Sequence, residues 1–276
     1  MTAATALLAT ERAPARAPGR AGTRVSVLRS GWPLMLRTTA PLAPTPVTDW
    51  AGRCAEPARV HLAAGAAGPL GGDLLRLEVR VGAGSALVLG EIAPTLLLPG
   101  TYGEESRLDV RVRVGAGACL AWLPELVIAG RGCRHRTDVR IALAEGARLV
   151  VREEVLFGRH GEAPGRYRQR VRVETPAGPL HDQELAVGPG APGWDGPAVT
   201  GGHRTAGTLL VVDPGAVRAE RAGGALAGPG TAVMELGGGV LVGALAPDTA
   251  ELRRRLEGAA ALLLTGAEAP VPAAAG

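Results

Sequence analysis

A cysteine and a histidine two positions apart are the first residues that could do chemistry. Cys133 and His135 would share one face of a strand, where thiolate and imidazole are ligands that transition metals accept. Two ligands begin such a site without completing it, and Cys119 or His61 could help only if the fold brings them close. Ordinary side-chain packing is the simpler interpretation, and metal binding by this pair stays open from the sequence.

Two adjacent glutamates are the second candidate. Glu153 and Glu154 stand in a segment typical of a strand, so their side chains point to opposite faces and one of them points inward. An inward carboxylate is costly unless it is paired. An ion pair with one of the many arginines is the simpler explanation, and a polar interior path or a metal contact is the functional one.

Catalytic patterns are missing from the sequence. Ser85 follows Gly84, but the next residues do not complete the G-x-S-x-G turn of a nucleophilic serine. The glycines at 82 and 84 stand between two strands, whereas a phosphate-binding loop needs a helix behind it. Asp73 follows two glycines and is expected, on the simplest interpretation, to accept backbone N–H groups in a turn. The sequence therefore predicts a protein that is not an enzyme.

Composition favours a β-protein with many turns. Hydrophobic residues make up 46% of the 276 residues but aromatic residues only 3%, so the core must be built from valine, leucine, isoleucine and alanine. The 41 glycines and 22 prolines suit frequent chain reversals. A net charge of +4 is mild, and arginines alternate with acidic residues instead of clustering beside aromatics. Nucleic-acid binding is therefore disfavoured.

The cysteines and the hydropathy indicate the compartment. Cys54, Cys119 and Cys133 form an odd, sparse set, which argues against disulfides and for a reducing environment. The N-terminal residues lack the basic start and long apolar stretch of a signal peptide, so none is expected, and no apolar run approaches the ~20 residues that cross a bilayer. We expect a cytoplasmic protein without membrane contact.

Two-residue alternation is the strongest structural signal. Along Leu75–Val81 the apolar residues share one face and the charged ones the other, as in a half-buried strand. The pattern returns at Leu108–Val114 and Asp138–Leu143 and, more weakly, at Val171–Glu174, each time before a glycine-containing turn and a further apolar or strand-like run. This period of about 30 residues indicates stacked units. We predict a mainly β fold, layered or helical, of repeated hairpins, with a short C-terminal helical element.

The ends of the chain differ from the middle. Residues 1–22 are low in complexity and are predicted to be a disordered leader, and residues 267–276 a flexible tail. Residues 23–266 are predicted to form a single domain. Its final helix begins at Asp248, an N-cap residue with Glu251 three positions on.

Several segments in this order resemble the urease accessory protein family UreD, also called UreH. They extend over roughly residues 25–245, and the order of the G-G-D, W-L-P and G-T-L-L elements is more specific than any one of them. The segments are Gly68–Asp73, Gly84–Thr95, Ala121–Ile128, Gly146–Arg159, Arg168–Glu174 and Ala206–Leu210.

This resemblance implies a fold and a role. Proteins of the UreD type have many β-strands in a helical, layered arrangement, and they are chaperones without enzymatic activity. They bind urease apoprotein on one side and the accessory protein UreF on the other, and UreF recruits the nickel-carrying GTPase UreG. Nickel is thought to pass through an internal polar tunnel, so the resemblance implies transient Ni²⁺ and no permanently bound cofactor.

The resemblance also singles out residues. Asp73, Thr95 and Glu153 match polar tunnel-lining positions of the family and are the candidates for transient nickel contact. The segment that matches W-L-P has a structural or an interfacial role. It supplies the candidates for partner binding: Trp122, Pro124 and Glu125.

The alternative function is a generic β-scaffold that binds proteins and is unrelated to urease. A third hypothesis is a hydrolase whose catalytic residues the sequence does not reveal.

Overall fold

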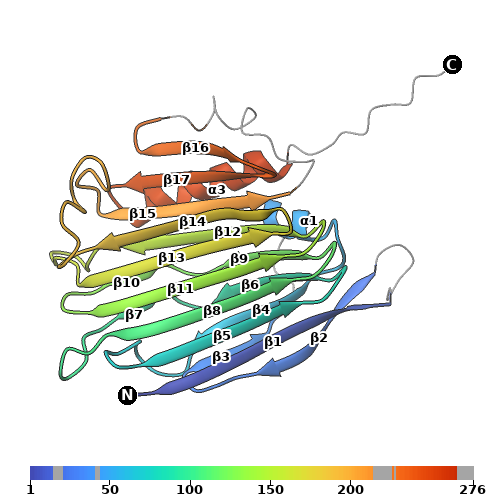
Figure 1. Cartoon of the computed structure of the whole chain (residues 1–276), viewed down its shortest axis with the longest axis horizontal. Helices are drawn as coiled ribbons and strands as arrows, with labels where there is room; N and C mark the ends of the chain where they lie inside the picture. The colour runs from blue at the N-terminus through green and yellow to red at the C-terminus, as the bar shows by residue number, and fades with distance from the viewer. Residues whose placement is uncertain (15–20, 41–43, 214–225, 227, 266–276) are drawn as a thin grey trace.

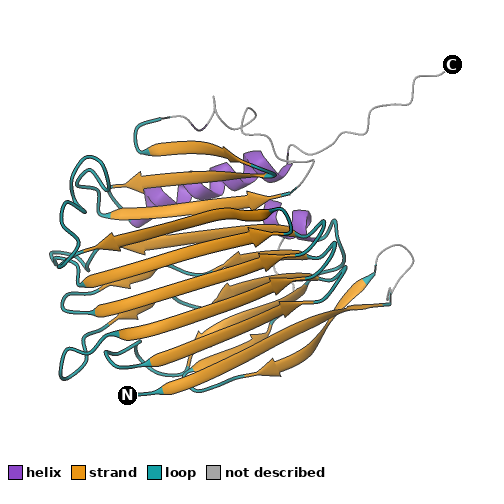
Figure 2. Ribbon diagram, viewed as in Figure 1, coloured by secondary structure: helices purple, strands orange, loops and turns teal. Residues whose placement is uncertain are grey.

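Two β-sheets stacked face to face form the body of the molecule (Figure 1). The computed structural model describes residues 1–14, 21–40, 44–213, 226 and 228–265. Strands account for most of these residues, and one long helix lies near the C-terminal end of the fold (Figure 2). The mainly β, layered fold with a C-terminal helix that the sequence predicts is confirmed.

The front sheet in Figure 1 has seven strands in the order β14-β13-β11-β8-β5-β1-β2. Its five central strands, β1, β5, β8, β11 and β13, run parallel to one another, and an antiparallel strand closes each edge. The bounds of these strands are Ala3–Ala13 (β1), Gly22–Arg29 (β2), Leu74–Val81 (β5), Ser106–Val114 (β8), Arg134–Leu143 (β11), Arg166–Thr175 (β13) and Gly178–Val187 (β14).

The rear sheet has ten strands. Eight follow the order β16-β17-β15-β12-β9-β6-β4-β3, and the short strands β7 and β10 join it at the side through β12. Their bounds are Leu34–Thr38 (β3), Ala58–Ala64 (β4), Ala86–Glu91 (β6), Thr95–Leu97 (β7), Cys119–Leu123 (β9), Val127–Ala129 (β10), Arg148–Leu156 (β12), Thr205–Val212 (β15), Thr231–Leu236 (β16) and Gly239–Ala246 (β17).

Helices α1 (Pro46–Ala51) and α3 (Thr249–Thr265) cover the outer face of the rear sheet. The predicted start of the second helix is confirmed, because the Asp248 carboxylate accepts a hydrogen bond from the Glu251 N–H at 2.8 Å. Among the described residues, no helix combines the length and the apolarity that crossing a bilayer requires.

The number of buried faces explains why some strands alternate between apolar and charged residues while others are apolar throughout. From Leu75 to Val81 of β5 the apolar side chains point between the sheets and the charged ones point to solvent, so the sequence alternates. The first five residues of β6 are all buried, because one face of this strand meets the front sheet and the other meets the helices. A continuous apolar run is what a strand covered on both faces needs.

Three of the four repeated units are not hairpins. After Gly84, Gly117 and Gly146, which have φ of 62°, 60° and 64°, the chain crosses from the front sheet to the rear sheet. Each strand then pairs in parallel with its counterpart in the next unit, and adjacent parallel strands cannot be joined by so tight a turn. Only the unit around Gly178 is a hairpin, joining β13 to antiparallel β14.

The prediction of a disordered leader is wrong for residues 3–13. They form β1, whose Ala6 and Leu8 are 0% and 1% exposed between the sheets. The alanine-rich sequence can be ordered because β5 and β2 supply backbone partners on both sides. Residues 15–20, like the predicted tail at 267–276, lie outside the described residues.

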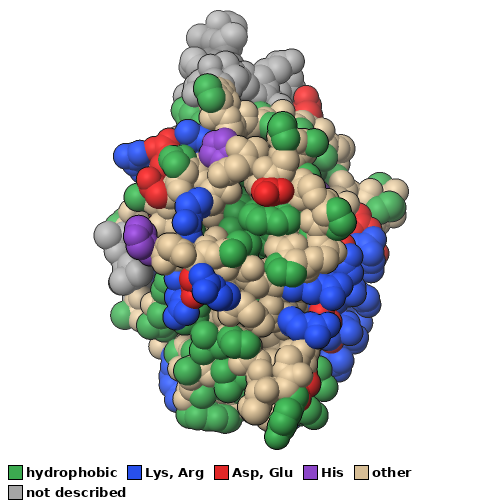
Figure 3. All heavy atoms as spheres, turned by 90° about the vertical axis from the view of Figure 1, so that its left-hand side faces the viewer, with side chains coloured by type: hydrophobic (Ala, Val, Ile, Leu, Met, Phe, Trp, Pro, Cys, Tyr) green, Lys and Arg blue, Asp and Glu red, His purple; other side chains and the backbone are tan. Residues whose placement is uncertain are grey.

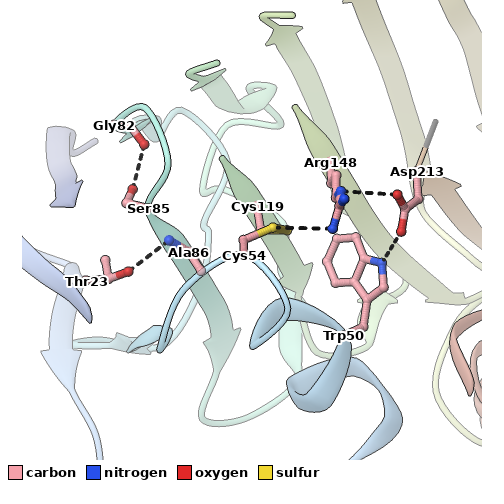
Figure 4. The surroundings of a disulfide bond; sticks show 9 residues. All are labelled: Thr23, Trp50, Cys54, Gly82, Ser85, Ala86, Cys119, Arg148 and Asp213. Atoms are coloured by element: carbon pink, nitrogen blue, oxygen red, sulfur yellow. Dashed lines mark hydrogen bonds and ion pairs between the residues drawn. A yellow bond between two sulfur atoms is a disulfide. The ribbon is translucent and has the colours of Figure 1, made fainter. Parts of the chain in front are cut away.

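The expectation of unpaired cysteines is also wrong. A disulfide joins Cys54, just after α1, to Cys119 at the start of β9 (Figure 4). Beside it, the Trp50 indole N–H donates to Asp213 at 2.8 Å, and Arg148 forms an ion pair with Asp213 at 3.2 Å. The sequence separation of 65 residues hid this pairing, which depends on α1 packing against β9.

Leu8 tests whether β1 belongs to the core. Replacing Leu8 with alanine is expected to lower the free energy of unfolding by about 2–4 kcal/mol, because it leaves a cavity between the sheets. Leu7→Ala, on the opposite face of the same strand, is the matched control and should cost less. Urea denaturation measures both, and two equally small losses would contradict the assignment of β1 to the core.

Candidate functional site

Polar side chains replace apolar ones between the sheets at the end of the molecule where β7 and β10 lie, on the left in Figure 1. Parallel register brings them together. Ser106 of β8, His135 of β11 and Tyr167 of β13 occupy equivalent positions and form one inward row across the front sheet. In the next inward row Thr137 lies beside Gln169.

Hydrogen bonds connect these two rows. Nδ1 of His135 lies 2.7 Å from the Ser106 hydroxyl, and Nε2 lies 3.0 Å from the Thr137 hydroxyl. The ring of His135 stacks on Tyr167, with 6.1 Å between the ring centres, and the Tyr167 hydroxyl donates to Oε1 of Gln169 at 2.9 Å. Burial lowers the pKa of His135 to about 4, so this imidazole is neutral at physiological pH.

The network continues to the rear sheet through Glu153 of β12. The Gln169 amide donates a hydrogen bond to the Glu153 carboxylate, so one contact joins the two sheets across the polar interior. A strand residue of the rear sheet and a strand residue of the front sheet thus meet although 16 positions separate them.

A cavity of about 60 Å³ lies beside this contact. Its lining includes a second polar candidate, Thr95 of β7, together with the three partner-binding candidates Trp122, Pro124 and Glu125. Five of the six residues that the family resemblance singles out therefore surround one space: Thr95, Trp122, Pro124, Glu125 and Glu153.

Two of the carboxylates at this cavity are neutralised by arginine. Arg253 of α3 reaches Glu125 at 2.9 Å and Glu154 at 2.7 Å, and Arg152 approaches Glu154 at 2.9 Å. The Glu154 side chain is only 1% exposed, and these two cations compensate the cost of burying its carboxylate. The simpler expectation for the glutamate pair, an ion pair with arginine, holds for Glu154.

The other two carboxylates have no such partner. Within the described ranges, neither Glu91 nor Glu153 forms an ion pair, and both line the cavity. Burial raises the pKa of Glu153 to about 7, although the hydrogen bond from Gln169 opposes this. Burial likewise raises the pKa of Glu91 to about 7; the Glu125 N–H, which donates to this carboxylate at 3.3 Å, opposes the effect, and the charge of Glu125 adds to it. Both carboxyls change protonation near neutral pH.

Asp73 lies apart from the other candidates and does not line this cavity. One carboxylate oxygen accepts from the Thr2 backbone N–H at 2.7 Å, and the other accepts from Leu70 N–H at 3.1 Å. These bonds join the start of the chain to the turn before β5. The geometry is that of the turn carboxylate that the sequence suggests as the simpler interpretation.

The partner-binding candidates are mostly interior. Trp122 is 6% exposed in the core between the sheets, and Pro124 is buried as well. Glu125 is half-buried and engaged by Arg253. Trp122 and Pro124 therefore offer little surface to another protein in this structure, and they shape the wall of the cavity.

The Cys133 and His135 pair is not completed into a metal centre. Cys133 packs among apolar residues, and burial raises the pKa of its thiol to about 11. The expected helpers are elsewhere, because Cys119 is in the disulfide and His61 lies beside the Thr39 hydroxyl at 2.8 Å. Across the described part of the chain, no three His, Cys, Asp or Glu side chains gather closely enough to hold a metal ion.

Comparison with known proteins gives a consistent result. The family model described as UreD urease accessory protein matches residues 5–275. This chain belongs to the UreD family. It is 46% identical to urease accessory protein UreD of Streptomyces avermitilis, over 93% of this chain and 97% of that protein. It is 43% identical to the UreD of Streptomyces coelicolor, over 95% and 99%, and 39% identical to that of a Parafrankia strain, over 92% and 88%.

Sequence reasoning missed part of the polar interior of this member of the UreD family. The missed residues contribute a carboxylate, hydroxyls and an amide to the cavity, and they are Glu91, Thr137, Tyr167 and Gln169. One available signal is that in β11 and β13 the apolar alternation begins late: the inward positions nearest the strand start are polar or aromatic.

Glu153→Gln tests the buried carboxyl. Because its pKa is higher in the folded state (about 7) than in the unfolded state (4.5), the stability that this carboxyl contributes is fully present below pH 4.5 and is lost as pH rises through about 7. The variant keeps an acceptor for Gln169 but loses this dependence. At pH 8 it should be more stable by on the order of 1–3 kcal/mol, with the difference vanishing below about pH 4.5.

Denaturation across pH measures this effect, with exposed Glu235→Gln as the matched control. If wild type and the Glu153→Gln variant show the same dependence of unfolding free energy on pH, the pKa of the Glu153 carboxyl is not raised by folding.

Arg253→Met tests the neutralised carboxylates. Removing the cation leaves Glu154 buried with Arg152 alone and releases Glu125, so we expect a loss of about 2–4 kcal/mol in the free energy of unfolding. The adjacent Arg254→Met removes a largely exposed guanidinium and should change stability by less than about 0.5 kcal/mol. Equal effects of the two substitutions in thermal or urea unfolding would refute the bridging role of Arg253.

Proposed function

We propose that this chain is a non-catalytic chaperone of urease maturation that acts in the cytoplasm. It binds urease apoprotein on one side and UreF on the other, and it meets the GTPase UreG through UreF. Membership of the UreD family and the similarity to proteins named urease accessory protein over nearly their whole length support a role in urease maturation. They also disfavour the alternative of a β-scaffold unrelated to urease.

We further propose that nickel destined for urease passes through the polar interior. The observation that carries this proposal is the position of Glu153 and Gln169, which line both the inner cavity and a larger, open one of about 540 Å³. The open cavity is lined by residues of β13 and β14 of the front sheet and of β15 and β17 of the rear sheet. The hydrogen-bonded pair thus stands between the interior and the surface.

The chemistry of the interior suits a cation that must leave again. Nickel accepts oxygen and nitrogen ligands, and transport requires contacts that are favourable yet weak. Glu91 and Glu153 each titrate at about pH 7, so each can release a proton as a divalent cation arrives. Thr95 adds a neutral oxygen. Spaced single ligands, in place of a closed metal centre, keep such an ion mobile.

Asp73 takes no part in this proposed route. Its two oxygens are occupied by backbone N–H groups, and its proposed role is to hold the first residues of the chain against the turn before β5.

Co-expression with urease tests the function. Urease subunits, UreF and UreG are produced with the wild-type chain, without it, or with the variant Glu91→Gln/Glu153→Gln. Nickel per urease active site is measured by elemental analysis, together with urease activity and co-purification of the chain. We expect little nickel without the chain, and several-fold less than wild type with the double variant, which should still co-purify.

Glu235→Gln removes an exposed carboxylate from β16 and should support full loading. Normal nickel content with the double variant would exclude Glu91 and Glu153 from the route while leaving the chaperone role intact. Full urease activation in the absence of the chain would refute the chaperone role itself.

A further inference from the structure

Charged side chains cover the outer face of the front sheet, where blue arginine atoms gather on the right of Figure 3. Near the start of the strands, carboxylates stand among the arginines. Asp109 contacts Arg107 at 2.9 Å, and Asp138 contacts Arg136 at 2.7 Å and Arg107 at 3.3 Å. This part of the face neutralises its own charge.

Toward the ends of the same strands, arginines lie beside arginines. Parallel register places Arg111 next to Arg140 and Arg140 next to Arg172, and on the next outward row it places Arg80 next to Arg113. Like charges on neighbouring strands repel each other and destabilise a sheet. The repulsion between these guanidinium groups is relieved when an anionic group lies between them.

These five arginines surround a depression of about 280 Å³, here termed the arginine hollow. Its lining also includes Glu78 and Glu174, so the formal charge is +3 (five arginines less two glutamates). The short side chain of Ala142 leaves the outward position between Arg113 and Glu174 open.

Ion pairing leaves most of this charge available. In the part of the chain that the structure describes, Arg111, Arg113 and Arg140 form no ion pair, and Arg80 reaches Glu78 only at 3.8 Å. Arg172 forms an ion pair with Asp182 at 3.3 Å. The hollow thus differs from the rest of the same face, where neighbouring carboxylates already occupy the arginines.

We propose that the arginine hollow docks a carboxylate-bearing surface of a protein partner. The planar guanidinium group donates two parallel hydrogen bonds to a carboxylate, which makes arginine well suited to this contact. In a β-sheet, neighbouring positions lie about 4.8 Å apart across strands and about 6.8 Å apart along a strand. Two or more acidic side chains at similar spacing on the partner can each meet a guanidinium.

The composition of the face favours a protein over a nucleic acid. Outward positions on β5, β8, β11 and β13 carry no aromatic side chain on which bases could stack. The interleaved Asp109, Asp138 and Glu78 would repel a continuous phosphate backbone, whereas a protein surface can place basic groups opposite them. A second copy of this chain is a poorer fit, since each copy carries a net charge of +4.

The proposal rests on the proposed function, which requires protein partners, and it is tested on them. Arg111→Gln/Arg140→Gln removes two charges from the hollow. Arg76→Gln/Arg168→Gln removes two charges from the same sheet face outside the hollow and is the matched control. Affinities for immobilised urease apoprotein and for UreF are measured from about 50 to about 300 mM salt.

We expect the hollow variant to bind one of the two partners about tenfold more weakly at low salt, with a flatter salt dependence, because two charge-assisted contacts are lost. The control should change by less than about twofold. Its melting temperature and that of the hollow variant, followed by circular dichroism, confirm that both remain folded.

Wild-type affinity of the hollow variant for both partners would overturn the docking proposal and leave the chaperone function standing. Equal losses in the two double variants would do the same, because they would reflect net charge alone. The proposal would also be overturned if the hollow were needed only for binding a duplex DNA fragment and not for binding either protein. It would likewise be overturned if light scattering showed a dimer of the wild-type chain that the hollow variant no longer forms. Failure of the unmutated chain to bind either partner would overturn the proposed function and the docking proposal together.

Discussion

Parallel, in-register pairing of successive units determines which side chains lie together in this fold. Each unit places a strand in the front sheet and a strand in the rear sheet, and the next unit repeats the placement one strand further on. A residue type that recurs at one position of the unit therefore becomes a row across the sheet. Apolar rows form the core, polar rows form the cavity at one end, and outward arginine rows form the hollow at the other.

The rows carry different energetic consequences. Apolar rows stabilise the fold through burial, and they tolerate little polar substitution. The polar rows and the buried carboxylates beside them depart from that rule. Glu153 is held in an interior that favours its neutral form, and the buried Glu154 forms ion pairs with Arg152 and Arg253. Departures from good local packing concentrate at functional sites, which is why the cavity and not the core is the place to look for function.

Much of the fold was predictable because burial imposes a period on the sequence. The alternation of Leu75–Val81 and its repeats correctly marked the strands, and Asp248 marked the start of α3. Which strands pair was not predictable, since a glycine with positive φ serves equally in a hairpin and in a turn between two sheets. The ordered strand β1 and the Cys54–Cys119 disulfide were missed for a related reason, as both depend on partners distant in the chain.

The candidate site likewise has features that the sequence predicts and features that depend on partners distant in the chain. The alternation along the chain predicts a mainly β protein, and the resemblance to the UreD family points to Thr95, Trp122 and Glu153, which the cavity brings together. The contact of Gln169 with Glu153, the neutralisation of Glu125 and Glu154 by Arg253 and the separate position of Asp73 could be seen only in the folded chain. A period along the chain reports which face of a strand is buried. Contacts between faces, and the pKa values that follow from them, depend on how the two sheets and the helix pack.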